Sequence, residues 1–277
     1  SWKTGRMAFQ LLTDEKRITA MLSGIYQQTE RVYPTEGDLK NVRTLITYIK
    51  NRMLNEKEIQ KLEEEAEIHL AAIYKEYCRQ LREQQLMDYD DQMVYAYNML
   101  RKIPELLAYF QEKYPYICVD EAQDTSKIQH AIIRLLAGQS GNLFMVGDED
   151  QSIYGFRAAY PQALTEFDTV YPNAKVLYME QNYRSTRQIV AAADRFIQKN
   201  HNRRPKHMKA TQGSGPAVRE CSVYDRQKQY AYLCKLAENC TVETAVLYRD
   251  NDSALPLIDR MDRAGIPYRC RQVESLF

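Results

Sequence analysis

The chain has 277 residues, of which 44% are apolar, so it is long enough to bury a core and to form about two domains. Its formal net charge of +1 excludes a strong charge over the whole surface, and any site for nucleic acid must be a local patch. No apolar run reaches the length of a membrane span and no signal peptide opens the chain, which predicts a cytoplasmic protein without a membrane partner. Its six cysteines show no CxxC pair and no metal spacing, which indicates reduced thiols.

The sequence from about Asp14 to Glu112 has a helical pattern. Apolar side chains recur at steps of three and four, which predicts one long helix from about Glu56 to Gln84. The apolar stripe consists of Ile59, Leu62, Ala66, Leu70, Ile73, Tyr77 and Leu81. The opposite face is rich in Glu, Lys and Arg, which is typical of a solvated surface.

An apolar run from Tyr116 to Val119 leads directly into Asp120 and Glu121. Such a run predicts a strand covered on both faces of a parallel sheet, and such sheets bind ligands at the carboxyl ends of their strands. Because adjacent carboxylates need a compensating charge, the pattern indicates Mg²⁺ beside the first and a polarised water beside the second. The alternative is an acidic cap on the helix expected from Ile128 to Leu136, with Asp124 or Ser126 as the cap residue.

A second expected strand, Leu143 to Val146, ends in a similar way. It leads into the sequence GDEDQSIYGFRAA, in which Gly147 permits a sharp exit and Asp148, Glu149, Asp150 and Gln151 follow at once. Further strands are expected at Val176 to Met179, Val218 to Val223 and Ala245 to Tyr248, with a loop at Gln212 to Pro216. Because helices are expected between several of these strands, the alternation predicts an open, mainly parallel α/β sheet.

The strand expected at Val176 to Met179 leads into Gln181, Asn182, Tyr183 and Arg184, just before a helix capped by Ser185 or Thr186. An arginine at such a turn can bind a phosphate with its planar fork, and a tyrosine can stack on a base. A surface ion pair is the alternative for Arg184.

Three of these segments resemble motifs of the UvrD/Rep/PcrA family of superfamily 1 DNA helicases. VDEAQDT is similar to the Walker B segment of the family, VGDEDQSIYGFRAA to its third motif and MEQNYRST to its fourth, in the same order and at similar spacing. MDYDDQ resembles the acidic segment before the Walker B strand, and IPYRCRQVESLF resembles the stretch that closes the first half of the second motor domain. The resemblance is weak before Leu86 and strong from there to about Asn200.

The resemblance implies an α/β fold with partial RecA-like parallel sheets, of the P-loop NTPase type, and an N-terminal all-helical insert domain. Residues 1–113 would be the helical insert (1B-like). Residues 114–175 would be the C-terminal half of the first RecA-like motor domain (1A-like), and residues 176–277 the N-terminal half of the second (2A-like).

The resemblance also implies site residues. Asp120 would hold Mg²⁺, and Glu121 would be the base that deprotonates the attacking water. Gln151 would sense the γ-phosphate of ATP, Arg184 would act as an arginine finger, and Tyr183 would stack on adenine. ATP and Mg²⁺ are therefore the implied cofactors.

On the DNA side, Phe156 would stack on a base of single-stranded DNA, and Arg157 would tie that face to the phosphate side. The stretch from Lys199 to Lys209 contains no acid, and its cations, among them Lys199, Arg203, Arg204 and Lys206, can contact phosphates. A solvated loop is the alternative for this stretch. The implied partners are single-stranded and partially duplex DNA, together with repair or replication proteins. Translocation from 3′ to 5′ is carried over from the family.

The sequence departs from the family in ways that affect the expected activity. Ala122 and Ala158 stand where many relatives have Phe and Gly. No G-x-x-x-x-G-K-[ST] loop occurs, and the later motifs are missing, so the chain resembles the middle of a helicase. Its start at Ser1 rather than Met also suggests a piece of a longer protein. We expect the chain by itself to bind Mg²⁺ and ATP poorly and to be inactive.

Two other functions are compatible with the sequence. One is a non-catalytic module, derived from a helicase, that binds nucleic acid or a protein through the helical part and the basic stretch. The other is a two-metal nuclease site built from Asp88, Asp90, Asp91, Asp120, Glu121, Asp148 and Asp150, although the usual nuclease Lys or His constellation is missing.

Overall fold

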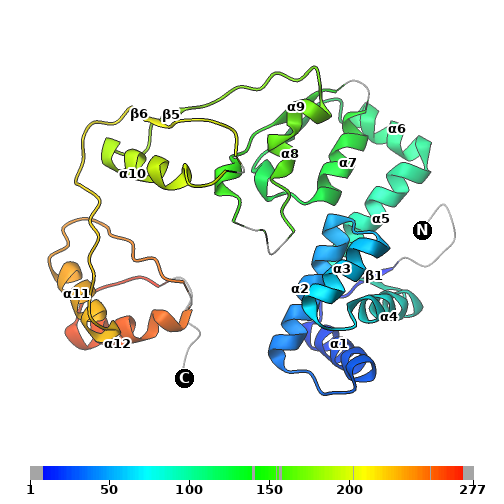
Figure 1. The fold of residues 1–277 in the computed structure, drawn as a ribbon, viewed down its shortest axis with the longest axis horizontal. Helices are drawn as coiled ribbons and strands as arrows, with labels where there is room; N and C mark the ends of the chain where they lie inside the picture. The colour runs from blue at the N-terminus through cyan, green and yellow to red at the C-terminus, as the bar shows by residue number, and fades with distance from the viewer. Residues whose placement is uncertain are drawn as a thin grey trace. The chain divides into compact units, whose positions relative to one another are not determined.

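The computed structural model describes residues 9–138, 141–153, 155, 158–201, 203–249 and 251–270. The chain forms two compact units (Figure 1). Unit 1 comprises residues 1–182 and 193–209, and unit 2 comprises residues 183–192 and 210–277. We describe each unit by itself. In the described ranges, no helix combines the length and the apolar character that crossing a bilayer requires.

The first part of unit 1 is mainly helical. Its elements are β1 (Gln10–Leu11), α1 (Glu15–Glu30), α2 (Glu36–Arg52), α3 (Glu56–Ala66), α4 (Leu70–Glu83), β2 (Leu86–Met87), α5 (Tyr89–Lys102) and α6 (Pro104–Lys113). Apolar side chains from α1, α2 and α4 form the core, and Leu22, Ile25, Val42 and Ile73 are among its most buried members. β1 pairs with β2 in parallel, so the expectation of an all-helical part is wrong in this detail.

The predicted long helix from Glu56 to Gln84 is also wrong, because the chain turns between α3 and α4. Glu67 adopts a left-handed backbone conformation with φ of 54° and ends α3. Two carboxylates fix the turn: Glu30 accepts the backbone N–H of His69 at 2.7 Å, and Glu63 accepts that of Ala71 at 2.6 Å. As a result, α4 buries its stripe against α1, while α3 has no buried residue and packs on α4.

The second part of unit 1 contains the two acidic strand ends. β3 (Ile117–Val119) and β4 (Leu143–Met145) pair in parallel with Ile117 opposite Leu143, which confirms both predicted strands. The helix predicted between them is α7 (Lys127–Ala137), and Ser126 is its N-cap. Cys118 is exposed, so the expectation that the first of these strands is covered on both faces is wrong, and Phe144 on β4 is exposed as well. Two short helices follow, α8 (Gln162–Thr165) and α9 (Phe167–Val170).

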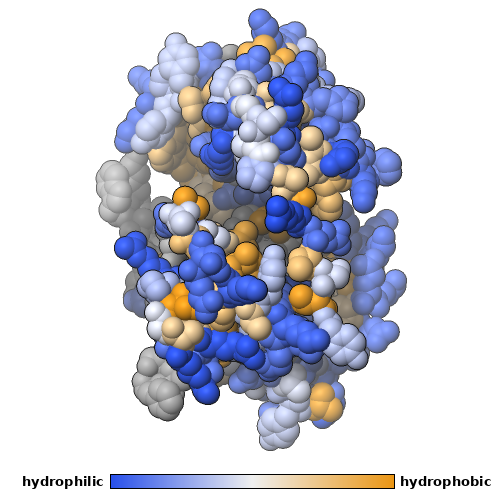
Figure 2. Space-filling view, turned by 90° about the vertical axis from the view of Figure 1, so that its left-hand side faces the viewer, coloured by the Kyte–Doolittle hydropathy of each residue, from blue (hydrophilic) through white to orange (hydrophobic). Residues whose placement is uncertain are grey.

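Strands predicted later in the chain do not form. β5 (Gln181–Asn182) pairs with β6 (Lys209–Ala210), but the segments 176–179, 218–223 and 245–248 contain no strand. A strand is stable only where a neighbour satisfies its backbone hydrogen bonds, and these segments have no such neighbour among the described residues. Their apolar side chains are exposed instead, for example Met179 at 82% and Leu247 at 93%. Figure 2 shows hydrophobic side chains at the surface, between hydrophilic ones.

Unit 2 has a small core of its own. Its helices are α11 (Arg226–Glu238) and α12 (Leu255–Ala264), and α10 (Arg187–Ile197) begins in unit 2 and ends in unit 1. Tyr230 on α11 packs with Leu257 and Met261 on α12 and with Ile266. The predicted loop at Gln212 to Pro216 is confirmed. All six cysteines of the chain are free thiols.

Candidate functional site

The ends of β3 and β4 are joined beyond the strands themselves. Val146 N–H donates to the carbonyl of Val119 at 2.8 Å, and Ala122 N–H donates to the carbonyl of Val146 at 3.0 Å. This ladder brings Asp120 and Glu121 beside the turn that begins at Gly147. Both predicted acidic strand ends therefore meet at one edge of the sheet.

Asp120 and Glu121 are both exposed at this edge. Glu121 has a φ of 49°, a left-handed conformation that is uncommon for a residue other than glycine, and its N–H donates to Asp120 Oδ1 at 2.9 Å. Backbone strain of this kind often accompanies functional sites. Because Ser126 caps α7, the helix does not use these two carboxylates as its cap, and their oxygens are the ligands that Mg²⁺ prefers.

Gln123 connects the two strand ends, and the sequence analysis did not identify it. Its side chain is 1% exposed. Its Nε2 donates to Glu121 Oε2 at 2.6 Å, and its Oε1 accepts the backbone N–H of Asp148 at 3.0 Å. One buried amide thus fixes the Glu121 carboxylate and the start of the second acidic turn. A single glutamine two residues after Glu121 forms no sequence pattern that would predict this contact.

Gly147 is required by close packing. A Cβ at this position would lie 2.8 Å from Gln123 Oε1 and 2.7 Å from a methyl group of Leu164. Real side chains do not tolerate such contacts, so Gly147 allows the Gln123 amide to reach the backbone of Asp148.

The second acidic turn is a 3-10 turn, Glu149–Gln151, which the Asp148 side chain caps by accepting the N–H of Asp150 at 3.2 Å. Gln151 Nε2 donates to Asp148 Oδ2 at 2.8 Å. Burial raises the pKa of Asp148, but hydrogen bonds from Lys206 and Gln151 outweigh this effect, and the pKa lies below its ordinary value. Asp148 therefore stays ionised at neutral pH.

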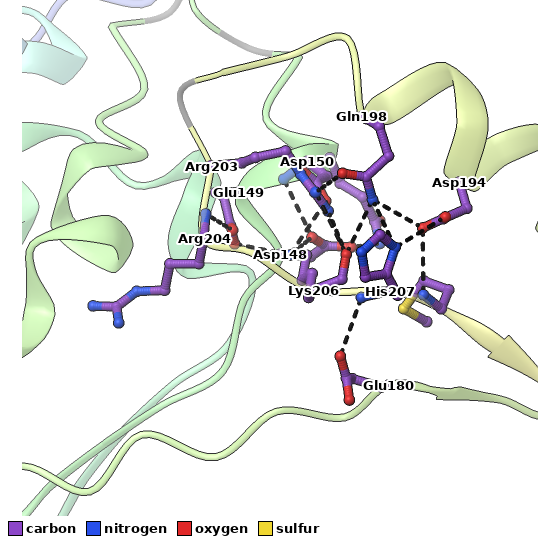
Figure 3. A network of polar contacts seen from close by, with 12 residues as sticks. Asp148, Glu149, Asp150, Glu180, Asp194, Gln198, Arg203, Arg204, Lys206 and His207 are labelled. Atoms are coloured by element: carbon purple, nitrogen blue, oxygen red, sulfur yellow. Dashed lines mark hydrogen bonds and ion pairs between the residues drawn. The ribbon is translucent and has the colours of Figure 1, made fainter.

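The basic stretch lies against this turn (Figure 3). Arg203 makes a bidentate ion pair with Asp150, with N–O distances of 2.7 and 2.8 Å. Lys206 Nζ lies 2.6 Å from Asp148 Oδ1 and 3.0 Å from Glu149 Oε2. The side chains of Arg203 and Lys206 are only 5% and 13% exposed.

Other cations of the stretch behave differently. The guanidinium of Arg204 points away from the acidic turn in Figure 3 and pairs with Asp168 at 2.6 Å. Lys199 is exposed. The structure thus pairs Arg203, Arg204 and Lys206 with carboxylates, and their contact with DNA phosphates stays a prediction.

The remaining predicted site residues lie elsewhere. Tyr183 and Arg184 belong to unit 2, are exposed, and precede α10. Phe156 and Arg157 lie outside the described residues.

The carboxylates of the segment MDYDDQ contact residues of the helical part. Asp88 and Asp91 pair with the buried Lys50 at 2.6 and 2.8 Å, and Asp90 accepts hydrogen bonds from Thr47 and Asn51. In the part of the chain that the structure describes, no three Asp, Glu, His or Cys side chains are grouped so that they could hold a metal ion. The two-metal nuclease interpretation therefore has no geometric support.

Comparison with known proteins identifies the family. A family model described as the UvrD/REP helicase N-terminal domain matches residues 4–172, which is more than half of the chain. The chain belongs to the UvrD/Rep helicase family. A second model, the UvrD-like helicase C-terminal domain, matches residues 177–277.

Individual members of the UvrD/Rep family are longer than this chain. The chain is 36% identical over 232 residues to the ATP-dependent DNA helicase PcrA of Staphylococcus epidermidis. The alignment covers 80% of the chain and 32% of that relative. The PcrA of Staphylococcus aureus is 34% identical over the same length. The chain thus spans about a third of the length of these curated relatives. The family match spans both acidic strand ends.

Proposed function

We propose that this chain is the central part of an ATP-dependent DNA helicase that moves along single-stranded DNA and unwinds duplex. The observation that supports this most strongly is the bridge from Glu121 through Gln123 to Asp148, because it joins two acidic strand ends within a helicase-family sequence. Parallel sheets bind their ligands at such strand ends.

In the proposed reaction, Glu121 accepts a proton from the water that attacks the γ-phosphate. The hydrogen bond from Gln123 orients the Glu121 carboxylate toward that task. Asp120 is the proposed ligand of Mg²⁺, because its exposed carboxylate supplies hard oxygen ligands directly beside Glu121. When bound, Mg²⁺ would neutralise the developing charge on the phosphates.

Other residues complete the proposed site. Gln151, held by Asp148, would contact the γ-phosphate. Arg184 would stabilise the transition state as an arginine finger, and Tyr183 would stack on the adenine.

We propose that Phe156 stacks on a base of single-stranded DNA and that Arg157 and Lys199 also contribute to DNA binding. Arg203, Arg204 and Lys206 would reach phosphates only after leaving their carboxylate partners. We propose translocation from 3′ to 5′. We also propose that residues 1–113 form the helical insert, residues 114–175 half of the first motor domain and residues 176–277 half of the second motor domain.

The isolated chain is proposed to be inactive. It contains no phosphate-binding loop, whose N–H groups and lysine supply much of the affinity for ATP in this fold class. Purified residues 1–277 should hydrolyse no ATP and bind single-stranded DNA weakly and in a strongly salt-dependent manner.

The proposal is tested with a full-length protein that contains this chain. We expect ATP hydrolysis stimulated by single-stranded DNA, and displacement of a duplex strand when the flanking single strand has the polarity for 3′ to 5′ movement. Arg184→Ala should lower turnover about a thousand-fold, as loss of an arginine finger typically does. A full-length protein without DNA-stimulated ATP hydrolysis would contradict the proposal.

A further inference from the structure

We propose that Lys206 and Arg203 are positioning residues, which hold the acidic turn Asp148–Gln151 so that Gln151 faces the proposed ATP site. We call these two cations and the turn the latch. The inference deepens the proposed function and rests on it for the meaning of Gln151. The contacts themselves lie wholly within unit 1.

The latch is continuous with the proposed catalytic groups. Lys206 Nζ donates to Asp148 Oδ1 at 2.6 Å, and the other oxygen of the same carboxylate accepts from Gln151 Nε2 at 2.8 Å. One carboxylate therefore joins the lysine to the proposed phosphate sensor. The backbone N–H of Asp148 in turn binds Gln123, which holds Glu121.

Electrostatics explain why the turn depends on these cations. Asp148, Glu149 and Asp150 are consecutive, and the side chains of Glu149 and Asp150 are only 7% and 11% exposed. Carboxylates this close repel each other, and burial removes the water that would otherwise screen them. Lys206 contacts all three, at 2.6, 3.0 and 3.4 Å. Without Lys206, Arg203 would be the only cation in ion-pair contact with these carboxylates among the described residues.

The two cations of the latch lie in a segment that leads into unit 2, so a shift of this segment would act on the latch. Arg203 and Lys206 lie 53 and 58 residues beyond their partners Asp150 and Asp148, in the segment that leads into β6 and from there into unit 2. Figure 3 shows both side chains converging on the acidic turn from this segment, with Gln198 beside Arg203. A shift of the segment would pull directly on the carboxylate that holds Gln151.

The first experiment measures positioning in the 277-residue chain and requires no ATP hydrolysis. In Lys206→Met, hydrogen exchange at the backbone amides of Asp150 and Gln151 should be about tenfold faster or more, while the amides of α1 and α4 keep their rates. Lys206→Arg should restore slow exchange, because arginine can also pair with the carboxylates. Lys175→Met, which removes an exposed lysine of the same unit, is the matched control.

The second experiment measures ATP hydrolysis by the full-length protein. Lys206→Met should lower kcat about tenfold or more with little change in KM for ATP, since Gln151 is proposed to act on the phosphate after binding, and Lys206→Arg should stay close to wild type. Unchanged exchange in Lys206→Met would overturn the latch, and so would altered exchange accompanied by an unchanged kcat. If the wild-type protein hydrolyses no ATP, the proposed function fails, and exchange alone decides whether Lys206 positions the turn.

Discussion

Two clusters in unit 1 pair a lysine with closely spaced carboxylates, and we propose that only the second of them serves catalysis. In the helical part, Lys50 is 1% exposed and pairs with Asp88 and Asp91. At the end of β4, Lys206 is 13% exposed and pairs with Asp148, Glu149 and Asp150. In both clusters a lysine from a distant segment compensates carboxylates that follow one another closely in the sequence.

The clusters differ in what else their carboxylates contact. Asp88 also caps α5 and accepts a hydrogen bond from the buried Tyr77 at 3.2 Å, so all its partners belong to the core of the fold. Asp148 instead binds Gln151 and, through its backbone, Gln123. An acidic run therefore predicts a need for positive charge, but only its other contacts show whether the charge serves folding or chemistry.

The largest effect on stability is expected at Lys50. Lys50→Met should lower the free energy of unfolding by about 3 to 5 kcal/mol, because it leaves two carboxylates without their buried cation. Burial lowers the pKa of Lys50, yet the two aspartates outweigh burial and hold it above its ordinary value, so the lysine is charged in the native state. Urea denaturation measures the loss.

Lys61→Met is the control for this prediction, because the Lys61 side chain is 78% exposed and its single ion pair is a surface one. We expect it to change stability by less than about 1 kcal/mol. Equal effects of the two substitutions would show that the Lys50 cluster does not support the fold.

A smaller effect is expected at Gln123, which belongs to the other cluster. Gln123→Met preserves the approximate shape of the side chain but removes the acceptor of the Asp148 N–H and the donor to Glu121. The free energy of unfolding should fall by about 1 to 3 kcal/mol, the cost of an unsatisfied buried group. Gln60→Met on the exposed face of α3 should change little. A loss of stability no larger than that of the control would show that the Gln123 side chain does not stabilise the bridge between Glu121 and Asp148.

The smallest effect is expected on the pH dependence of stability in acid. The pKa of Asp148 lies below its ordinary value of 3.8, so its contribution to stability is present above that pH and is lost as the pH falls through the native-state pKa. The groups that face its carboxylate are Lys206, Gln151 and the N–H of Asp150. Below pH 3.8, wild-type stability should therefore fall more steeply with pH than that of Asp148→Asn. Parallel slopes in urea denaturation would contradict this.

Local patterns predicted β3, β4 and α7, because an apolar run or a cap residue acts within a few positions of itself. The break between α3 and α4 was missed, because it depends on Glu30 binding His69 from 39 residues away. The strands expected at 176–179, 218–223 and 245–248 failed for a related reason. The apolar runs are present in the sequence, but strand formation depends on a neighbouring strand that the run itself does not specify.

The candidate site divides in the same way. Asp120 and Glu121 were predicted because they follow an apolar strand, and the comparisons confirm the family that their motif indicated. Gln123 was missed because an amide in a polar run carries no pattern. The charge of the basic stretch predicted contact with phosphates or a solvated loop, whereas the acidic run of opposite sign elsewhere in the chain was the signal for the latch.

The most direct test of the account is ATP turnover by Glu121→Gln in a full-length protein that contains this chain. The substitution removes the proposed proton acceptor while preserving the shape of the side chain. We predict that ATP binding stays nearly intact, whereas turnover falls by roughly three orders of magnitude or more. Turnover equal to that of the wild type, with the protein folded and ATP bound, would show that the acidic edge of β3 and β4 does not carry out the reaction.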